Sequence, residues 1–374
     1  MSTVSTGTQP TLSATAQAPV GPRRIDDYLK EVLLKSGSDL HFIAGDPPRV
    51  RLYGELQPLR PEVLSPQFVQ EVLYEIMPPN AIQRLEQQHG ADFAYLIPGV
   101  SRFRVNVMRQ LYGLGAVCRA IPSKALTLDE LAMPDAVRNL CKVNQGLILV
   151  TGKTGSGKST SLAAMIDDMN ARMKGHILTI EDPIEFVHTR KNCLISQREI
   201  GTHSPSFSTA LLSALREDPD VILVGELRDY ETMSIAVTAA EMGILVMGTL
   251  HTNGAAATVD RMVNAFPADK QSHVRAMLST SLRGVISQQL IPRANKRGRV
   301  AALEILVNTP AVANLIRQGK LDQLENTMQS GGQHGMRIMD SAIQELLDKG
   351  TINGKEAYKK AINKTKFEHL KDQG

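Results

Sequence analysis

The stretch GKTGSGKST, Gly152 to Thr160, decides the fold of this chain. It matches the pattern GxxxxGKS/T and lies between an apolar run, Gly146 to Val150, and a segment, Leu162 to Met169, whose apolar residues have helical spacing. A glycine-rich loop between a strand and a helix can turn its backbone N–H groups toward phosphate oxygens, and the positive end of the helix adds to the attraction. We therefore predict a nucleotide phosphate site.

The residues of this phosphate loop have distinct expected roles. Lys158 would reach the terminal phosphates, and the Ser159 hydroxyl would bind Mg²⁺. The residues predicted to contact the nucleotide are Gly152, Lys153, Thr154, Gly155, Ser156, Gly157, Lys158, Ser159 and Thr160. The competing interpretation is a chance glycine-rich turn, which is disfavoured because the strand and the helix that the motif requires are both present.

Short apolar runs alternate with helical segments around and after this loop. The runs are GLILV at 146–150, HILTI at 176–180, DVILV at 220–224 and ILVMGTL at 244–250. Strands that are apolar on both faces and separated by helices are typical of a parallel sheet covered on both sides. The predicted fold class is therefore α/β, with a P-loop domain over residues 140–350 and a smaller α+β domain over residues 25–122.

The remaining segments are predicted to lie outside these domains. Residues 1–24 are rich in Ser, Thr, Ala, Gln and Pro, which predicts a disordered tail, and residues 1–22 lack the charged and apolar parts of a signal peptide. Residues 123–139 are predicted to be a linker, and residues 351–374 a basic C-terminal tail. The longest apolar runs have the length of strands, so no membrane-spanning segment is expected.

The composition disfavours several classes of protein. The 374 residues include 42 Lys and Arg against 38 Asp and Glu, a net charge of +4. This balance argues against a nucleic-acid coat protein, and the aromatic content of 4% disfavours a stacking platform for single strands. The three scattered cysteines form neither a disulfide framework nor a metal-binding pair, which favours a reducing compartment.

An acid follows the DVILV run. Glu226 ends this predicted strand, which we expect to lie beside the strand of the phosphate loop, so that the carboxylate points at Mg²⁺. The competing interpretation is a structural salt bridge between Glu226 and Arg228.

A second acidic group, EDPIE, follows the HILTI run. Any of Glu181, Asp182 and Glu185 could polarise the attacking water, although an acid cluster at a helix start is the alternative. His251 ends the ILVMGTL run at the same edge of the sheet, where it could sense the terminal phosphate or remain a structural hydrogen-bonding group.

Two arginines are spaced by two residues in RFRVNV. In a strand, Arg102 and Arg104 would project from one face, and two guanidinium groups without matching acids would repel each other unless an anion is expected. A nucleotide phosphate supplied by another domain or subunit fits this requirement. A solvated strand face is the alternative.

Four motifs occur in order and together resemble a family. GKTGSGKST, ILTIEDPIEFVH, SALREDPDVILVGELRD and MGTLHTNGAAATVDRMV are similar to the Walker A, Asp-box, Walker B and His-box motifs of the type II/IV secretion ATPase superfamily. With GSDLHF at 37–42, RFR at 102–104 and GMRIMDSAIQELLDKGTI at 335–352, the chain resembles the type IV pilus retraction ATPases of the PilT and PilU types. The resemblance implies a PAS-like N-terminal domain joined to a RecA-like domain.

The resemblance also implies an activity and partners. It implies a homohexameric ring at the inner, cytoplasmic face of the cytoplasmic membrane, attached only peripherally, that hydrolyses ATP with Mg²⁺. The ring would turn an inner-membrane pilus platform protein and depolymerise pilin, with a paralogous retraction ATPase as a further candidate partner and no nucleic acid.

Residue roles carried over from the family are expectations of the same kind. Lys158 and Ser159 would bind phosphate and Mg²⁺, and Glu226 would be the Walker B glutamate. Glu185 would activate water, which sets it above Glu181, and His251 would be the His-box histidine. The arginines that would reach nucleotide across a subunit interface are Arg102, Arg104 and Arg119.

The sequence departs from the family in three places. It lacks the four-cysteine zinc site of pilus assembly ATPases, which favours retraction. It reads AVANLIRQ at 311–318 where PilT-type motors have AIRNLIRE, which leaves an accessory, PilU-like role open. It also has Lys153 where proline is common. A type II secretion or pilus assembly ATPase and a RecA-type DNA motor remain as further alternatives.

Overall fold

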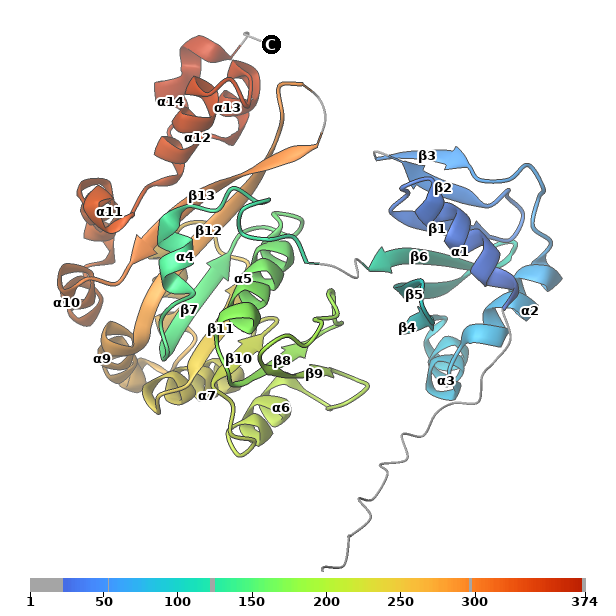
Figure 1. Ribbon diagram of the computed structural model, residues 1–374, viewed down its shortest axis with the longest axis horizontal. Helices are drawn as coiled ribbons and strands as arrows, with labels where there is room; N and C mark the ends of the chain where they lie inside the picture. The colour runs from blue at the N-terminus through green and yellow to red at the C-terminus, as the bar shows by residue number, and fades with distance from the viewer. Residues whose placement is uncertain (1–22, 53, 122–124, 296–297, 372–374) are drawn as a thin grey trace, which may run out of the picture. The chain divides into compact units, whose positions relative to one another are not determined.

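A computed structural model describes residues 23–52, 54–121, 125–295 and 298–371. The chain divides into two compact units, Met1–Ser123 and Lys124–Gly374, each with its own sheet (Figure 1). The predicted disordered tail at 1–24 lies outside the described residues except for its last two positions, and Arg24 begins the first helix. Within the described residues, no helix is long and apolar enough to cross a membrane.

The first unit is built on an antiparallel sheet with the strand order β3-β2-β1-β6-β5-β4. Its strands are β1 (Asp39–Ile43), β2 (Arg49–Leu52), β3 (Glu55–Pro58), β4 (Gly90–Ile97), β5 (Ser101–Gln110) and β6 (Gly113–Ile121). Its helices are α1 (Arg24–Leu34), α2 (Pro66–Ile76) and α3 (Pro79–Gln88). Helix α2 begins after Ser65, whose hydroxyl accepts a hydrogen bond from Phe68 N. The α+β class expected for this region is confirmed.

The second unit contains the phosphate loop. Its strands are β7 (Gly146–Thr151), β8 (His176–Glu181), β9 (Leu194–Glu199), β10 (Val221–Val224), β11 (Leu245–Leu250), β12 (Leu282–Pro292) and β13 (Arg299–Val307). Its helices are α4 (Asp135–Leu140), α5 (Lys158–Arg172), α6 (Phe207–Ala214), α7 (Tyr230–Glu241), α8 (Ala255–Asn264), α9 (Gln271–Ser281), α10 (Pro310–Gln318), α11 (Leu324–Ser330), α12 (Met339–Asp348), α13 (Gly354–Lys360) and α14 (Lys364–Phe367).

The strand order of the second sheet is β13-β12-β7-β11-β10-β8-β9, with β13 antiparallel to β12 and the other pairs parallel. The α/β class is confirmed, and the four predicted apolar runs form β7, β8, β10 and β11. One expectation is wrong: β10, which precedes Glu226, does not lie beside β7. Strand β11 lies between them, so the strand that precedes His251 is the neighbour of the phosphate-loop strand.

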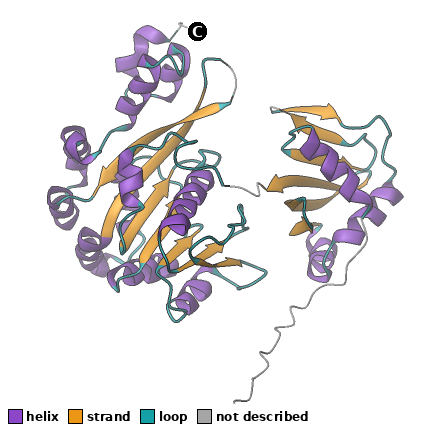
Figure 2. Cartoon of the chain, in the orientation of Figure 1, coloured by secondary structure: helices purple, strands orange, loops and turns teal. Residues whose placement is uncertain are grey.

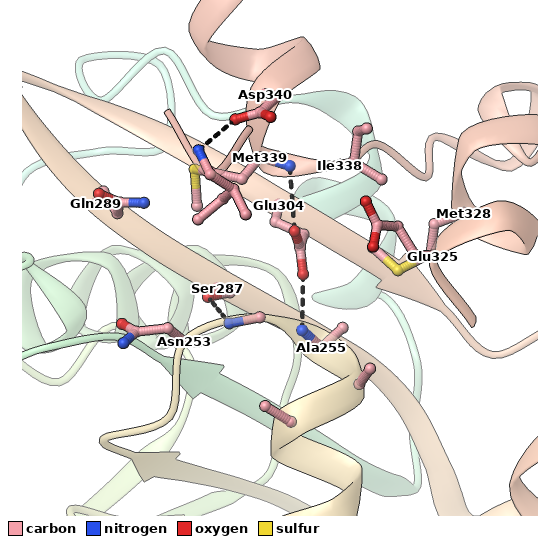
Figure 3. A pocket seen from close by; sticks show the side chains of 14 residues that line it. Asn253, Ala255, Ser287, Gln289, Glu304, Glu325, Met328, Ile338, Met339 and Asp340 are labelled. Carbon is pink, nitrogen blue, oxygen red and sulfur yellow. Dashed lines mark hydrogen bonds between the residues drawn. The ribbon is translucent and has the colours of Figure 1, made fainter. Parts of the chain in front are cut away.

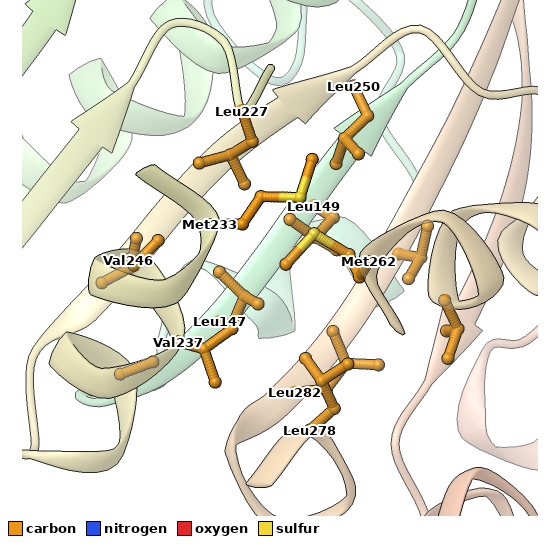
Figure 4. Packing of buried hydrophobic residues seen from close by; sticks show 14 of the residues in the cluster. Leu147, Leu149, Leu227, Met233, Val237, Val246, Leu250, Met262, Leu278 and Leu282 are labelled. Carbon is orange, nitrogen blue, oxygen red and sulfur yellow. The ribbon is translucent and has the colours of Figure 1, made fainter. Parts of the chain in front are cut away.

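Helices cover both faces of this sheet (Figure 2). Alternate residues of β7 point to opposite sides, so Leu147 and Leu149 pack with helices α7, α8 and α9, as Figure 4 shows for Met233 and Met262. Ile148 and Val150 pack on the other side with helix α5. Every residue of β7 is buried, which explains why its sequence reads as one continuous apolar run.

Strand β12 contains an irregularity. Its pairing with β7 shifts register between Leu282 and Gly284, so that Arg283 is an extra residue. After the shift, Val285 shares a face with Leu149 and Ile286 shares the opposite face with Val150. The extra residue therefore determines to which face of the sheet each later side chain of β12 points.

Two segments differ from the expected organisation. Residues 125–139 belong to the second unit rather than forming a free linker, because Leu128, Met133 and Val137 are buried in its core. The expected basic tail is folded over its described part: helices α13 and α14 lie there, and Phe367 is fully buried against the cluster that includes Ile291 of β12. The apolar residues that direct this packing are widely spaced among lysines, which hides them in the sequence.

Candidate active site

The phosphate loop joins β7 to helix α5 as predicted. Gly157, which precedes the first residue of the helix, has φ +90°, and Gly152 has φ +139°, values that side chains other than hydrogen rarely permit. The Ser156 hydroxyl oxygen is buried and has no hydrogen-bond partner among the described residues. A buried hydroxyl without a partner in a glycine cradle at a helix N-terminus fits a phosphate group.

Lys158 is held inside this loop. Its Nζ donates hydrogen bonds to the carbonyl oxygens of Gly152 at 2.8 Å and Lys153 at 3.3 Å. Burial lowers the pKa of the Lys158 ammonium below its ordinary value, while the charges of Glu226 and Glu185 oppose the shift. The charges of both carboxylates thus favour the ammonium form of Lys158.

Glu226 follows β10 and is held by Arg228 and His251. Its Oε2 lies 2.7 Å from Nη2 of Arg228, and its Oε1 lies 3.3 Å from Nε2 of His251. Burial raises the pKa of Glu226, but the hydrogen bond and charge of Arg228, with those of His251, outweigh it and hold the pKa below the ordinary value. The salt bridge between Glu226 and Arg228, which was the alternative interpretation of Glu226 in the sequence, is therefore present.

A cavity of about 300 Å³ opens beside this group. Glu226, Arg228, His251 and Arg261 line it together with Thr252. Arg261, on helix α8, was not predicted from the sequence as a site residue. The cavity therefore has one carboxylate and two arginines, which suits a polyanion bound with a metal ion.

The acids of EDPIE have different surroundings. Glu181 is engaged within the protein: its Oε1 accepts hydrogen bonds from Thr179 Oγ1 at 2.7 Å and Gln197 Nε2 at 3.3 Å, and its Oε2 accepts one from Glu185 N at 3.3 Å. Burial raises the pKa of Glu181 against these hydrogen bonds. Glu185 is exposed and Asp182 is exposed, so Glu181 supports the turn that carries Glu185 rather than facing water itself.

Hydrogen bonds join the loop after His251 to strands β12 and β13 (Figure 3). Gly254 N donates a hydrogen bond to Ser287 Oγ at 2.9 Å, and Ala255 N donates one to Glu304 Oε1 at 2.7 Å. The other oxygen of Glu304 accepts a hydrogen bond from Met339 N at 3.1 Å, so one half-buried carboxylate holds the N-termini of α8 and α12. Sequence reasoning missed Ser287 and Glu304 because no motif marks β12 and β13.

The three predicted arginines lie in the first unit, and two of them have acidic partners. Arg119 Nε lies 2.7 Å from Oδ1 of Asp39, and Arg104 Nε lies 3.6 Å from Oδ1 of Asp92. Arg104 and Arg119 are direct cross-strand neighbours on β5 and β6, while Arg102 lies opposite Ile121. The reasoning that Arg102 and Arg104 lack matching acids is therefore wrong for Arg104. The Arg119 side chain remains 67% exposed.

The residues of the second unit fit a nucleotide with Mg²⁺. The glycine cradle and Lys158 would hold phosphates, and Ser159 with Glu226 would hold the ion. Elsewhere in the described ranges, no group of three or more His, Cys, Asp or Glu side chains is arranged to hold a metal ion, and all three cysteines are buried and unpaired.

Comparisons with known proteins identify relatives of this chain. Residues 14–364 match the family described as type II/IV secretion system protein. The chain is 50% identical over 327 residues to the type IV pilus retraction ATPase PilT of Pseudomonas aeruginosa, across 87% of this chain and 95% of that protein. It is 39% identical over 332 residues to the type IV pilus ATPase PilU of the same organism, across 89% and 87%.

A solved structure extends the likeness to three dimensions. The chain superposes on the crystal structure of the pilus retraction motor PilT with bound ADP with a TM-score of 0.87 and 42% identity, covering 93% of this chain and all of that one. The likeness runs through both units.

Proposed function

This chain belongs to the type II/IV secretion system protein family, and on that basis we propose that it is an ATP-hydrolysing motor that drives type IV pilus retraction. One observation carries the proposal: a glycine cradle encloses the Lys158 ammonium and the Ser156 hydroxyl, which lacks a partner within the described ranges, in a chain that is 50% identical to a pilus retraction ATPase across 87% of its length. Twitching motility, which depends on shortening pili, would be the output.

Each residue would have one task in hydrolysis. Bound Mg²⁺ would neutralise charge on the phosphates, with Ser159 and Glu226 as its protein ligands. Lys158 would hold the terminal phosphates. Glu185, exposed and free to face water, would accept the proton of the attacking water, and His251 would report the state of the site to the loop that begins α8.

The working unit would be a homohexamer. Arg102, Arg104 and Arg119 lie in the first unit and would meet a nucleotide held by the second unit of a neighbouring copy. Hydrolysis would then change the contact between units, and that movement would act on an inner-membrane platform protein at the inner face of the cytoplasmic membrane.

A strain that lacks this protein tests the proposal. We expect the deletion strain to carry more surface pili and to lose twitching, and wild-type protein to restore both. Glu226→Gln, which preserves the side chain's shape, should restore neither. Loss of pili in the deletion strain would instead indicate a type II secretion or pilus assembly ATPase.

An accessory role, with nucleotide binding but little turnover of its own, is the second candidate. The AVANLIRQ segment favours the accessory role because it departs from the sequence of PilT-type motors. In helix α10, Val312 and Ile316 are buried, whereas Gln318 is exposed and donates a hydrogen bond to Asn314 Oδ1. The greater identity to PilT than to PilU supports the retraction motor. Purified protein that hydrolyses ATP only after a partner motor is added would favour the accessory role, and salt-dependent DNA binding would revive a DNA motor.

A further inference from the structure

Gln288 of β12 forms the rear wall of the phosphate loop. The preceding residue, Ser287, pairs with Thr151 at the end of β7, so Gln288 lies level with the start of the loop. Its backbone oxygen lies 2.4 Å from where a Cβ on Gly152 would stand, and its Nε2 lies 2.7 Å from where a Cβ on Gly157 would stand. The backbone contact leaves no room for a Cβ at Gly152, and a Cβ at Gly157 would push the Gln288 amide out of its place.

The side-chain amide of Gln288 has one orientation. Its Nε2 donates a hydrogen bond to Ser156 O at 2.7 Å, and its Oε1 accepts one from Ser161 Oγ at 2.7 Å. A carbonyl oxygen can only accept, so the nitrogen must face Ser156. Gln288 is 2% exposed, and a flipped amide would place two buried oxygens against each other.

This contact sets the direction of a phosphate-loop N–H group. A trans peptide is planar, and its C=O and N–H point in opposite directions. Because the Ser156 carbonyl points at Gln288, the N–H of Gly157 points away from β12 toward the open side of the loop. Ser156 also carries the buried hydroxyl that has no partner among the described residues, so this hydroxyl and the Gly157 N–H are adjacent groups in the cradle.

We propose that Gln288 is a positioning residue for the nucleotide, which aims the Gly157 N–H at a phosphate by holding the Ser156 carbonyl. Ser161 supports it by fixing the amide. The inference rests on the proposed function, since it requires a nucleotide phosphate in the loop, but it concerns binding and can be tested apart from hydrolysis.

The test measures binding of a fluorescent ADP analogue with Mg²⁺ to the full chain. Gln288→Met keeps the side chain's length and removes both hydrogen bonds, and we expect the Kd to rise about tenfold. Gln288→Glu keeps an oxygen for Ser161 but has no donor for Ser156 O, so the loss should be at least as large. At saturating ATP the kcat of Gln288→Met should stay within about twofold, because the chemical groups are intact.

A matched control separates positioning from stability. Ile286→Val lies on the same strand and face, and it removes a buried methyl group without touching the loop. It should lower the unfolding temperature and leave the Kd for ADP unchanged. If Gln288→Met fails to fold, Ser161→Ala decides, with an expected rise in Kd of about threefold.

The outcomes are distinct. ADP binding by Gln288→Met within twofold of wild type would overturn the inference and leave the motor proposal standing. Wild-type protein that binds ADP without hydrolysing ATP would overturn the motor proposal, and the Kd values of the Gln288 variants would still decide the role of this residue.

Discussion

Nε2 of His251 lies 3.3 Å from Oε1 of Glu226, across the ends of two neighbouring strands. The parallel register of β10 and β11 pairs Val224 with Gly248, so the sheet itself sets the separation of the two side chains. Arg228 holds the other oxygen of the carboxylate. A change of charge at Glu226 therefore alters the electrostatic interactions of two loops, the one that carries Arg228 and the one that leads into α8.

Removal of the Glu226 charge should separate hydrolysis from binding. We expect Glu226→Gln to slow steady-state phosphate release by about 100-fold, because an amide neither binds Mg²⁺ nor polarises water as a carboxylate does. The Kd for ATP should change by less than about threefold. Glu241→Gln is the control, since that carboxylate accepts a hydrogen bond from Thr280 on the exposed end of α7. A Glu226→Gln protein that releases phosphate at the wild-type rate would contradict the assignment.

We expect nucleotide affinity to begin to fall at a lower pH than it would if Lys158 had the ordinary pKa of a lysine. Burial lowers the pKa of Lys158 from its ordinary 10.5, and only the ammonium form attracts phosphate. The affinity is therefore fully present below the lowered pKa of the free protein and declines as the pH rises through it. A titration of the ADP Kd from neutral pH upward checks this. As a control, Lys153→Gln should leave unchanged the pH at which the affinity begins to decline. A decline that begins only at pH 10.5 in the wild-type protein would contradict the effect of burial on Lys158.

Two inactive variants should restore activity to each other. Arg104→Ala keeps the phosphate loop and loses an arginine, and Lys158→Ala does the reverse. If the arginine acts on a neighbouring copy, an equimolar mixture should hydrolyse ATP at about a quarter of the wild-type rate, because one in four neighbouring pairs combines the intact parts. Phosphate release from the mixture measures this after subunits exchange. A mixture as inactive as its components would place the arginines outside the shared site.

The C-terminal helices should depend on one carboxylate. Asp340 accepts hydrogen bonds from Ile362 N at 2.7 Å and Asn363 N at 2.8 Å, between α13 and α14. Asp340→Ala leaves both donors unpaired, so we expect a loss of about 2 kcal/mol and a fall of roughly 4–8 °C in Tm. Thermal unfolding measures the loss, and limited proteolysis should cut near residue 362 first. Asp348→Ala, at an exposed acceptor for Gln344, should behave as wild type.

The parts of the site that the sequence predicted are those that follow short apolar strands. Gly152–Thr160 and Glu226 were readable because each comes directly after a run that is buried on both faces, and β7 and β10 are such runs. The order of the strands was not readable, since nothing in the local sequence states that β11 lies between β7 and β10. Pairing between distant strands is a property of the whole sheet.

The parts that were missed depend on contacts across long stretches of chain. Gln288 meets Ser156 across 132 residues, and β12 carries three consecutive polar residues, 287–289, that do not read as a buried strand. Arg104 looked unpaired because its acid, Asp92, lies on another strand. The C-terminal segment looked like a solvated tail because its lysines outnumber the apolar residues that anchor it.

Because Arg283 is an extra residue in β12, the number of residues before Ser287 determines which face of the sheet each later side chain occupies. Ser287 and Gln288 are adjacent and point to opposite faces, one holding the loop after His251 and the other holding the phosphate loop. Deleting one residue before them would shift the strand's phase and exchange the two faces, so both loops would lose their supports at once. Ordinary substitutions along β12 act on one side chain at a time. Insertions and deletions are therefore the class of mutation to which this strand is most vulnerable, and a family member with a different spacing here would need a compensating change in the bulge.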